Sequence, residues 1–211
     1  SSDVCSSDLL KMTKTVLKEK FVQLTDEQMK QLLQCKDQDA LYSKFKEFIG
    51  EDFAMSDLKA VLSDFSALAE NNEAAITMMQ TIHNVIETVP GMQEKLAAAH
   101  DNAAAYALLK QYLGDVTLAN FEKACQSVDS LMNDVAPISA LTDTDLEAVT
   151  GGSWKSFWSG FKTGFVDTFK IIGSAVMIGV NIVGQNPSMA EKWGEPLEKS
   201  VKHLSDALHN K

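Results

Sequence analysis

The chain has 211 residues, a formal net charge of −10 and four prolines, which allows one or two globular domains of ordinary size. The charge is uneven, since residues 1–152 hold 12 lysines against 24 acidic side chains and residues 153–211 hold 7 lysines against 5, with no arginine anywhere. This acidic balance disfavours nucleic acid as a partner of the whole chain. A mildly cationic tail is typical of a segment that meets membranes, or of a weakly basic globular domain.

The sequence contains no arrangement of side chains typical of an enzyme or a metal site. Cys35 and Cys125 lie on helical patterns without a partner at metal-ligand spacing, and the histidines at positions 83, 100, 203 and 209 are isolated. Residues 153–211 contain no cysteine, which excludes disulfides there and disfavours thioether rings. We therefore predict no catalytic residue, no cofactor and no metal.

The first nine residues resemble a translated sequencing adapter joined to a gene, so we leave residues 1–9, with Cys5, out of the fold prediction. On that interpretation translation begins at Met12 or upstream of it. The lysines that follow, at positions 14, 18 and 20, do not precede the apolar region of a secretory signal. Synthesis in the bacterial cytoplasm is the resulting expectation.

Residues 10–128 show helical periodicity, and we predict an all-α fold that begins with a small helical bundle. An internal repeat aligns residues 32–62 with residues 96–125. Each copy is a helix, a glycine stop and a second helix that begins near Ser56 or Ala119. The aligned pairs are Leu32/Leu96, Asp37/Asp101, Ala40/Ala104, Tyr42/Tyr106, Phe45/Leu109, Phe48/Tyr112, Ile49/Leu113, Gly50/Gly114, Met55/Leu118 and Leu58/Phe121.

A third amphipathic helix is predicted between the two copies, ending before Pro90-Gly91. Its apolar positions are Ile76, Met79, Ile82, Val85, Ile86 and Val89. Met78 and Met79 are expected to pack in the bundle, although a methionine-lined groove is also typical of a surface that receives a partner helix. Residues 128–140, which include Pro137, are predicted to be a hinge, and the hinge and cleavage helix together form a segment at 129–152.

Residues 141–152, with the sequence LTDTDLEAVTGG, combine a helix start with two glycines. Thr142 and Asp145 form a capping-box pattern. On the predicted helix, the apolar residues Leu141, Leu146, Ala148 and Val149 lie within one half of the surface. Gly151 and Gly152 carry no side chain, so they can lie extended in a narrow cleft. The alternative interpretation is an ordinary amphipathic turn with a glycine C-cap.

This segment resembles the double-glycine leader peptides of bacterial bacteriocin-type precursors. The four motif positions are occupied by Leu141, Asp145, Leu146 and Val149, with aspartate where the family more often has glutamate. The resemblance implies cleavage after Gly152 by the cysteine-peptidase domain of an ABC transporter. The transporter would then export the freed C-terminal peptide.

Residues 92–128 resemble the Nif-type (nitrogen-fixation-related) leader domain of peptide precursors, and the first repeat resembles it more weakly. In that family the helical domain is a recognition handle for maturation enzymes or for the transporter, and the double glycine follows it. Tyr42 and Tyr106 are candidate docking residues on this view. Alternatively, they belong to the cores of small helical hairpins.

Residues 153–169 place six aromatic side chains on one helical face, at steps of three and four residues. They are Trp154, Phe157, Trp158, Phe161, Phe165 and Phe169. Lysines lie mainly beside or opposite this face, and Gly160 and Gly164 each weaken the helix in water by up to about 1 kcal/mol. We predict a membrane-active amphipathic helix, the alternative being a stripe buried in a protein core.

Residues 171–183 continue as an apolar run of 13 residues, which is shorter than the roughly 20 residues that span a membrane. We expect a hairpin arm, a self-associating helix, or a span that also uses the turns from Phe165 onward. Beyond Asn186-Pro187, an amphipathic helix beginning at Pro196 is a candidate lid over the aromatic segment.

We therefore expect a ribosomally made (RiPP-type) precursor, with a helical leader to Gly152 and a secreted, bacteriocin-like antimicrobial core peptide at residues 153–211. Its expected partners are a peptidase-containing ABC transporter and the bacterial membrane, and a maturation enzyme or an immunity protein is a further candidate. Two alternatives stay open. One is an uncleaved all-helical interaction or adaptor protein, and the other is a precursor whose core is enzymatically modified.

Overall fold

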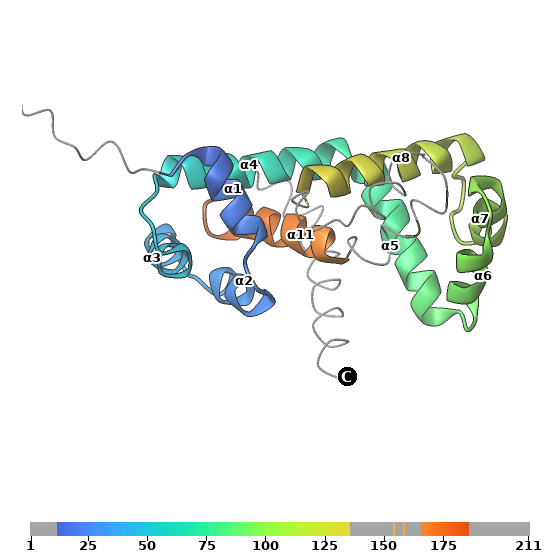
Figure 1. Cartoon of the computed structure of the whole chain (residues 1–211), viewed down its shortest axis with the longest axis horizontal. Helices are drawn as coiled ribbons and strands as arrows, with labels where there is room; N and C mark the ends of the chain where they lie inside the picture. Colours follow the sequence, from blue (N-terminus) through green and yellow to red (C-terminus); the bar gives the residue numbers. More distant parts are fainter. Residues whose placement is uncertain (1–11, 136–153, 155–157, 159–165, 186–211) are drawn as a thin grey trace, which may run out of the picture. The chain divides into compact units, whose positions relative to one another are not determined.

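The computed structural model describes residues 12–135, 154, 158 and 166–185 (Figure 1). Helices make up this part of the chain and it contains no strand, so the predicted all-α class is confirmed. Two compact units are present, unit 1 with residues 1–67 and 170–211 and unit 2 with residues 68–169. Each unit therefore combines residues from both sides of the predicted cleavage site.

Unit 1 contains α1 (Lys14–Val22), α2 (Asp26–Leu33), α3 (Gln38–Ile49), most of α4 (Met55–Asn71) and most of α11 (Val166–Asn181). The first three helices begin at side chains that accept a hydrogen bond from a free backbone N–H of the first turn. These N-caps are Thr13, Thr25 and Asp37, and Thr25 forms a complete capping box with Gln28. The helix starts are therefore specified by local sequence.

An aromatic cluster forms the centre of unit 1. The ring of Phe21 lies 6.0 Å from that of Phe45 and 5.5 Å from that of Phe65, and Phe45 lies 5.3 Å from Phe53. None of the four side chains is more than 3% exposed. Burying a side chain of this kind contributes about 1.5–3 kcal/mol, so this cluster holds α1, α3 and α4 together.

Unit 2 contains the end of α4, then α5 (Glu73–Thr88), α6 (Met92–Ala98), α7 (Asn102–Leu109) and α8 (Leu118–Val135). Helix α5 contacts α6 and α8, and α7 also contacts α6 and α8 (Figure 1). The apolar stripe predicted for α5 faces this interior, since Ile76, Met79, Ile82 and Val85 are all buried. Packing of that stripe, rather than helix propensity, stabilises α5.

Aligned positions of the two sequence repeats have the same local structure. Asp37 and Asp101 are both N-caps with φ −152° and ψ 175°, and their carboxylates accept the N–H of the alanine three residues later at 2.8 and 2.7 Å. Gly50 and Gly114 both have positive φ, 72° and 61°. The following helices begin at the aligned residues Met55 and Leu118, one residue before the predicted starts.

Two elements differ from the sequence prediction. Helix α7 ends at Leu109, five residues before Gly114, because the backbone tightens there into i to i−3 hydrogen bonds, such as Tyr112 N–H to Leu109 O at 2.8 Å. Helix α8 extends through Val135 and so occupies residues 128–135 of the predicted hinge. Its apolar stripe continues there, with Val128, Leu131, Met132 and Val135 buried.

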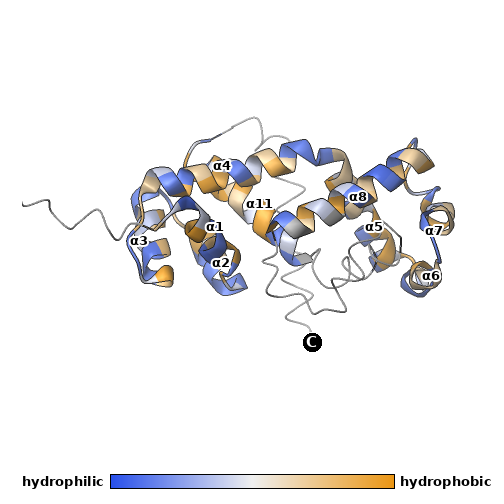
Figure 2. Ribbon diagram, turned by 45° about the horizontal axis from the view of Figure 1, so that its top comes forward, coloured by the Kyte–Doolittle hydropathy of each residue, from blue (hydrophilic) through white to orange (hydrophobic). Residues whose placement is uncertain are grey.

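Helix α11 is apolar along most of its length, whereas polar and apolar residues alternate along α4 and α8 (Figure 2). The helix ends at Asn181, and the chain then turns at Gly184, which has a left-handed φ of 73°, so that the N–H of Gln185 donates to the carbonyl of Gly179 at 2.8 Å. Among the residues that the structure describes, none of the helices combines the length and the apolar character that crossing a membrane requires.

Candidate functional site

The predicted cleavage segment lies outside the described residues. This applies to the glycine pair Gly151 and Gly152, to the recognition positions Leu141, Asp145, Leu146 and Val149, and to the aromatic residues Phe157, Phe161 and Phe165. The structure does describe Trp154, Trp158 and Phe169 from the predicted aromatic face. The candidate site is therefore built from the surroundings of these three side chains and of α11.

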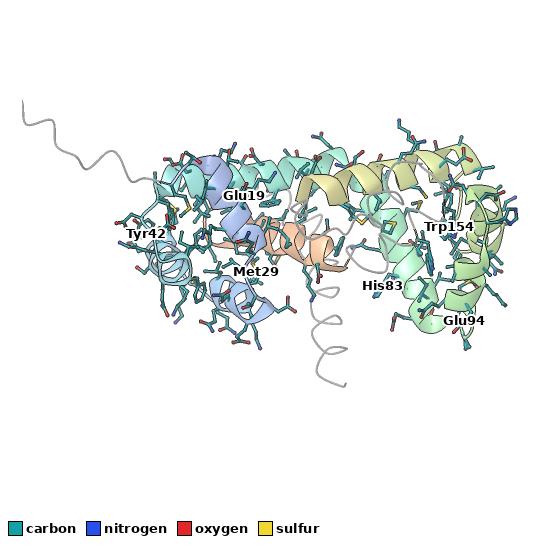
Figure 3. All side chains as sticks on the ribbon, in the orientation of Figure 1. Glu19, Met29, Tyr42, His83, Glu94 and Trp154 are labelled. Carbon is teal, nitrogen blue, oxygen red and sulfur yellow. The ribbon has the colours of Figure 1, made fainter. Side chains whose placement is uncertain are left out.

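Trp154 is buried inside unit 2, where it is only 1% exposed (Figure 3). Its indole Nε1–H donates a hydrogen bond of 2.8 Å to the carbonyl oxygen of Leu96 on α6. The same oxygen accepts the N–H of Ala99 at 3.2 Å, at the end of that helix. A buried indole N–H normally needs such a partner, and here a helix C-terminus supplies a carbonyl that the helix itself leaves free for a second donor.

Two aromatic rings stack against the Trp154 indole. Phe121 of α8 lies 5.8 Å from it with an interplanar angle of 27°, and Trp158 lies 5.5 Å away at 24°. Trp154 and Trp158 both have helical backbone and are four residues apart, the spacing at which side chains meet on one helical face. Phe121 is in turn 5.7 Å from Tyr106. We name Leu96 and Phe121, which both precede the predicted cleavage site, the Trp154 seat.

Burial extends to the other described aromatic residues of the predicted core peptide. Trp158 is 7% exposed and Phe169, which belongs to unit 2, is 4% exposed. These residues were predicted to form a membrane-active face, with burial in a protein core as the alternative. In the folded chain the described side chains of this set lie in protein interior, as the alternative predicted.

Helix α11 is anchored in unit 1 by polar contacts at both ends. The Lys170 ammonium lies 2.8 Å from the Asp26 carboxylate at the start of α2, with side chains 14% and 67% exposed. Beyond the other end, Gln185 Nε2–H donates to the carbonyl of Lys59 on α4 at 3.2 Å. Between these two contacts, the side chains of Ile172, Val176 and Ile178 are buried.

The two candidate docking tyrosines are hydrogen-bonded within the chain. The Tyr42 hydroxyl donates to the Asp52 carboxylate at 3.4 Å, and the Tyr106 hydroxyl donates to the carbonyl of Val116 at 2.7 Å. Asp52 also forms an ion pair with Lys46. The hydrogen bond from Lys46, together with its charge, lowers the pKa of Asp52, and the same bond raises the pKa of Lys46.

Cysteine and metal chemistry receive no support from the described part of the chain. Cys35 is half-buried, burial raises the pKa of its thiol, and its Sγ–H donates to the carbonyl of Gln31. Cys125 is buried at 1% exposure. Within residues 12–135, 154, 158 and 166–185, no cluster of three histidine, cysteine or acidic side chains is placed to hold a metal ion.

Sequence reasoning did not find the Trp154 seat or the Asp26 partner of Lys170. The hydrogen bond from Trp154 to Leu96 joins residues 58 apart, and the ion pair joins residues 144 apart. No local pattern marks such pairings, because they depend on tertiary packing. No protein-family model matches the chain, and neither a curated protein nor a solved structure matches it.

Proposed function

We propose that this chain is the precursor of an exported, bacteriocin-like antimicrobial peptide, cleaved after Gly152. The leader, residues 10–152, presents the double-glycine segment to the peptidase domain of an ABC transporter. The freed peptide of 59 residues then acts on bacterial membranes. The proposal is founded on the motif Leu141, Asp145, Leu146 and Val149 before the glycine pair, and on the charge difference between the two parts.

One structural observation supports it most directly, namely the burial of Trp154 and Trp158 immediately after the glycine pair. A peptide that inserts aromatic side chains into membranes would also attack the membrane of the producing cell. A precursor must therefore keep those side chains covered until export. The 1% exposure of Trp154 meets that requirement.

The mechanism we propose begins when the mildly cationic peptide approaches an anionic bilayer. The aromatic face from Trp154 to Phe169 then inserts at the interface. Helix α11 has 16 residues, which corresponds to about 24 Å at 1.5 Å per residue and is less than the roughly 30 Å hydrocarbon layer. Permeabilisation would thus require several copies, which Gly173, Ala175 and Gly179 allow to pack closely.

Cleavage is tested with the purified chain and its cognate transporter peptidase. Mass spectrometry is expected to find a product beginning at Ser153. Gly152→Phe is expected to reduce cleavage at least about a hundredfold, because a bulky side chain cannot enter a cleft shaped for glycine. Ser153→Ala keeps the glycine pair and serves as the control with near-normal cleavage. Cutting at any other bond would contradict the proposal.

Membrane action is tested by dye release from anionic vesicles exposed to the freed peptide. Phe161→Asp places a charge in the aromatic face and is expected to reduce release at least tenfold, since inserting a carboxylate is costly. Thr163→Asp adds the same charge on the opposite face of the helix and should change release much less. Equal release by both variants, or none by the parent peptide, would refute the membrane step.

The alternative function is an all-helical interaction or adaptor protein that is never cut. The observation that favours it is the same burial, since Trp154 and α11 contribute to the interiors of the two units as they would in a permanently intact protein. Mass spectrometry of the producing culture distinguishes the two functions. A peptide beginning at Ser153 in the medium supports the precursor, and an intact chain retained in the cells supports the adaptor.

A further inference from the structure

We propose that the leader remains bound to its own core peptide after the cut, as a non-covalent one-to-one complex in which the Trp154 seat is the main point of attachment. The inference rests on the proposed function, because it concerns what happens to the two products of that cleavage. The binding partner is specified by the chain itself, as the segment that begins at Ser153 and carries Trp154.

Trp154 already meets the conditions of an interface anchor. It is almost fully buried, the ring of Phe121 stacks on its indole at 5.8 Å, and its N–H donates to the carbonyl of Leu96, so two described contacts join it to the leader, whereas its contact with Trp158 lies within the core peptide. Tryptophan in a desolvated pocket is the residue type that most often dominates a binding free energy. None of these contacts uses the peptide bond between Gly152 and Ser153.

Unit 1 holds a separate part of the core peptide. Lys170 pairs with Asp26, Gln185 donates to Lys59, and the side chains of Ile172 and Val176 are buried. Two attachments on one peptide act together, because release of one leaves the other to keep the effective concentration high. A single cut at Gly152 removes neither attachment.

The functional consequence is that cleavage alone does not produce an active peptide. While Trp154 and Trp158 stay buried, the nicked complex cannot insert them into a bilayer. Activity begins when the core is pulled away from the leader, and directional export by the transporter that cuts the chain would do this. The leader thereby protects the producing cell during the interval between cutting and export.

The experiment uses the full chain with a site-specific protease sequence in place of residues 143–149, so that cutting does not depend on the native peptidase. After digestion, native size-exclusion chromatography with mass spectrometry is expected to find both fragments in one peak at equal amounts. Elution in two peaks at micromolar concentration would overturn the inference. If the native peptidase does not cut the natural chain, the proposed function fails, but co-elution of the two fragments would still show that they bind each other.

Variants identify the attachment point. Trp154→Ala is expected to speed dissociation of the nicked complex at least about tenfold, whereas Lys110→Ala, an exposed change in the same unit, should leave the rate unchanged. If Trp154→Ala prevents folding, Phe121→Leu alters the seat while leaving the core sequence intact, and it should also speed dissociation. Unchanged rates for both seat variants would overturn the role of Trp154.

A vesicle assay adds a readout that mere co-elution does not give. The nicked complex is expected to release less than about a tenth of the dye released by core peptide that has been separated in urea and diluted into anionic vesicles. Equal release by the two samples would overturn the protective role. If separated core releases no dye, the membrane step of the proposed function fails, and chromatography still decides whether the fragments stay bound.

Discussion

At the scale of single residues, Tyr42 and Tyr106 occupy aligned positions but have different hydrogen-bond acceptors. Tyr42 donates over 3.4 Å to an exposed carboxylate that is already paired with Lys46. Tyr106 donates over 2.7 Å to the partly buried backbone carbonyl of Val116. The backbone carbonyl of Val116 cannot rotate toward water as the Asp52 carboxylate can. Losing the tyrosine hydroxyl therefore costs more folding free energy at Val116 than at Asp52.

We therefore expect Tyr106→Phe to lower the free energy of unfolding by about 1 kcal/mol, and Tyr42→Phe to lower it by less than about 0.5 kcal/mol. Urea denaturation followed by circular dichroism measures both. The two variants remove the same hydroxyl from aligned positions and so act as controls for each other. Equal losses would show that the difference in acceptor has no energetic effect.

The Lys46 and Asp52 ion pair gives a pH dependence whose sign follows from its pKa shifts. The pKa of Asp52 lies below its ordinary value of 3.8, so the stabilisation is present above pH 3.8 and is lost as pH falls through the lowered value. The pKa of Lys46 lies above 10.5, so the stabilisation persists up to pH 10.5 and is lost above it.

The expected result is that Lys46→Gln lowers stability by a small, constant amount between about pH 5 and pH 9, with the difference from the parent shrinking below about pH 4. Denaturation curves at a series of pH values measure it. Asp52→Asn should show the same profile, and the double variant should lose no more than either single one. A difference that persists at pH 2 would contradict the assignment.

At the scale of helices, glycine is required by the backbone at some positions and can be replaced by alanine at others. Gly50 and Gly114 have positive φ and nothing within 4 Å of an added Cβ, so backbone conformation alone requires glycine there. Gly179 lies within α11, and its added Cβ would be 3.5 Å from Gln185 Oε1 and 3.8 Å from Leu62 Cβ, which are ordinary contacts. A methyl group at residue 179 therefore causes no clash.

Gly50→Ala and Gly114→Ala are each expected to destabilise the chain by about 1–2 kcal/mol, because alanine resists the left-handed conformation. Gly179→Ala should stabilise α11 by up to about 1 kcal/mol through its higher helix propensity. Thermal denaturation of the three variants measures the sign of each effect. Stabilisation at residue 50 or 114 would contradict the assigned role of these glycines.

Much of the helical framework could be predicted from sequence because its determinants are local. Asp37 and Asp101 as N-caps, and Gly50 and Gly114 as chain reversals, are signals that lie within one turn of the feature they specify. The early end of α7 was missed because residues 110–113 continue an apolar pattern while the backbone takes tighter turns. The length of α8 was underestimated because Pro137 and the polar residues near it indicated a hinge from residue 128, whereas the helix continues to Val135.

The candidate site was less predictable than the framework. An amphipathic aromatic stripe that includes Trp154 has the same pattern whether it faces lipid or protein. The sequence therefore indicates that its surroundings are apolar, but it does not distinguish a membrane from a protein interior. The partners Leu96 and Asp26 lie 58 and 144 residues away. Only the folded chain shows that the carbonyl of Leu96 accepts the indole N–H.

At the scale of the whole molecule, residues 1–152 carry an acidic balance and residues 153–211 a mildly cationic one, and opposite net charges attract at long range. The described contacts that join the two parts are nevertheless mostly apolar, apart from the Lys170 and Asp26 ion pair and the hydrogen bonds from Trp154 to Leu96 and from Gln185 to Lys59. Salt shortens the screening length from about 10 Å at 0.1 M to about 3 Å at 1 M. High salt therefore weakens the electrostatic attraction between the two parts, while the apolar side chains between them stay buried.

For the nicked chain we expect the dissociation rate in 1 M NaCl to stay within about threefold of the rate in 0.1 M NaCl. Fluorescence of labelled core peptide during dilution measures the rate. Lys170→Gln removes the described ion pair, so the variant should show an even smaller salt effect. Release more than tenfold faster in high salt would mean that charge, rather than the buried indole, holds the fragments together.

The position of Trp154 in the chain also limits how a peptidase reaches its bond. Only Ser153 separates the glycine pair from the buried indole, and two residues of extended chain reach at most about 7 Å. On the proposed function, a peptidase that closes around Gly151 and Gly152 therefore acts within about 7 Å of chain from a buried indole. We therefore expect the rate of that hydrolysis to depend on local opening of the chain around the glycine pair, rather than on global unfolding.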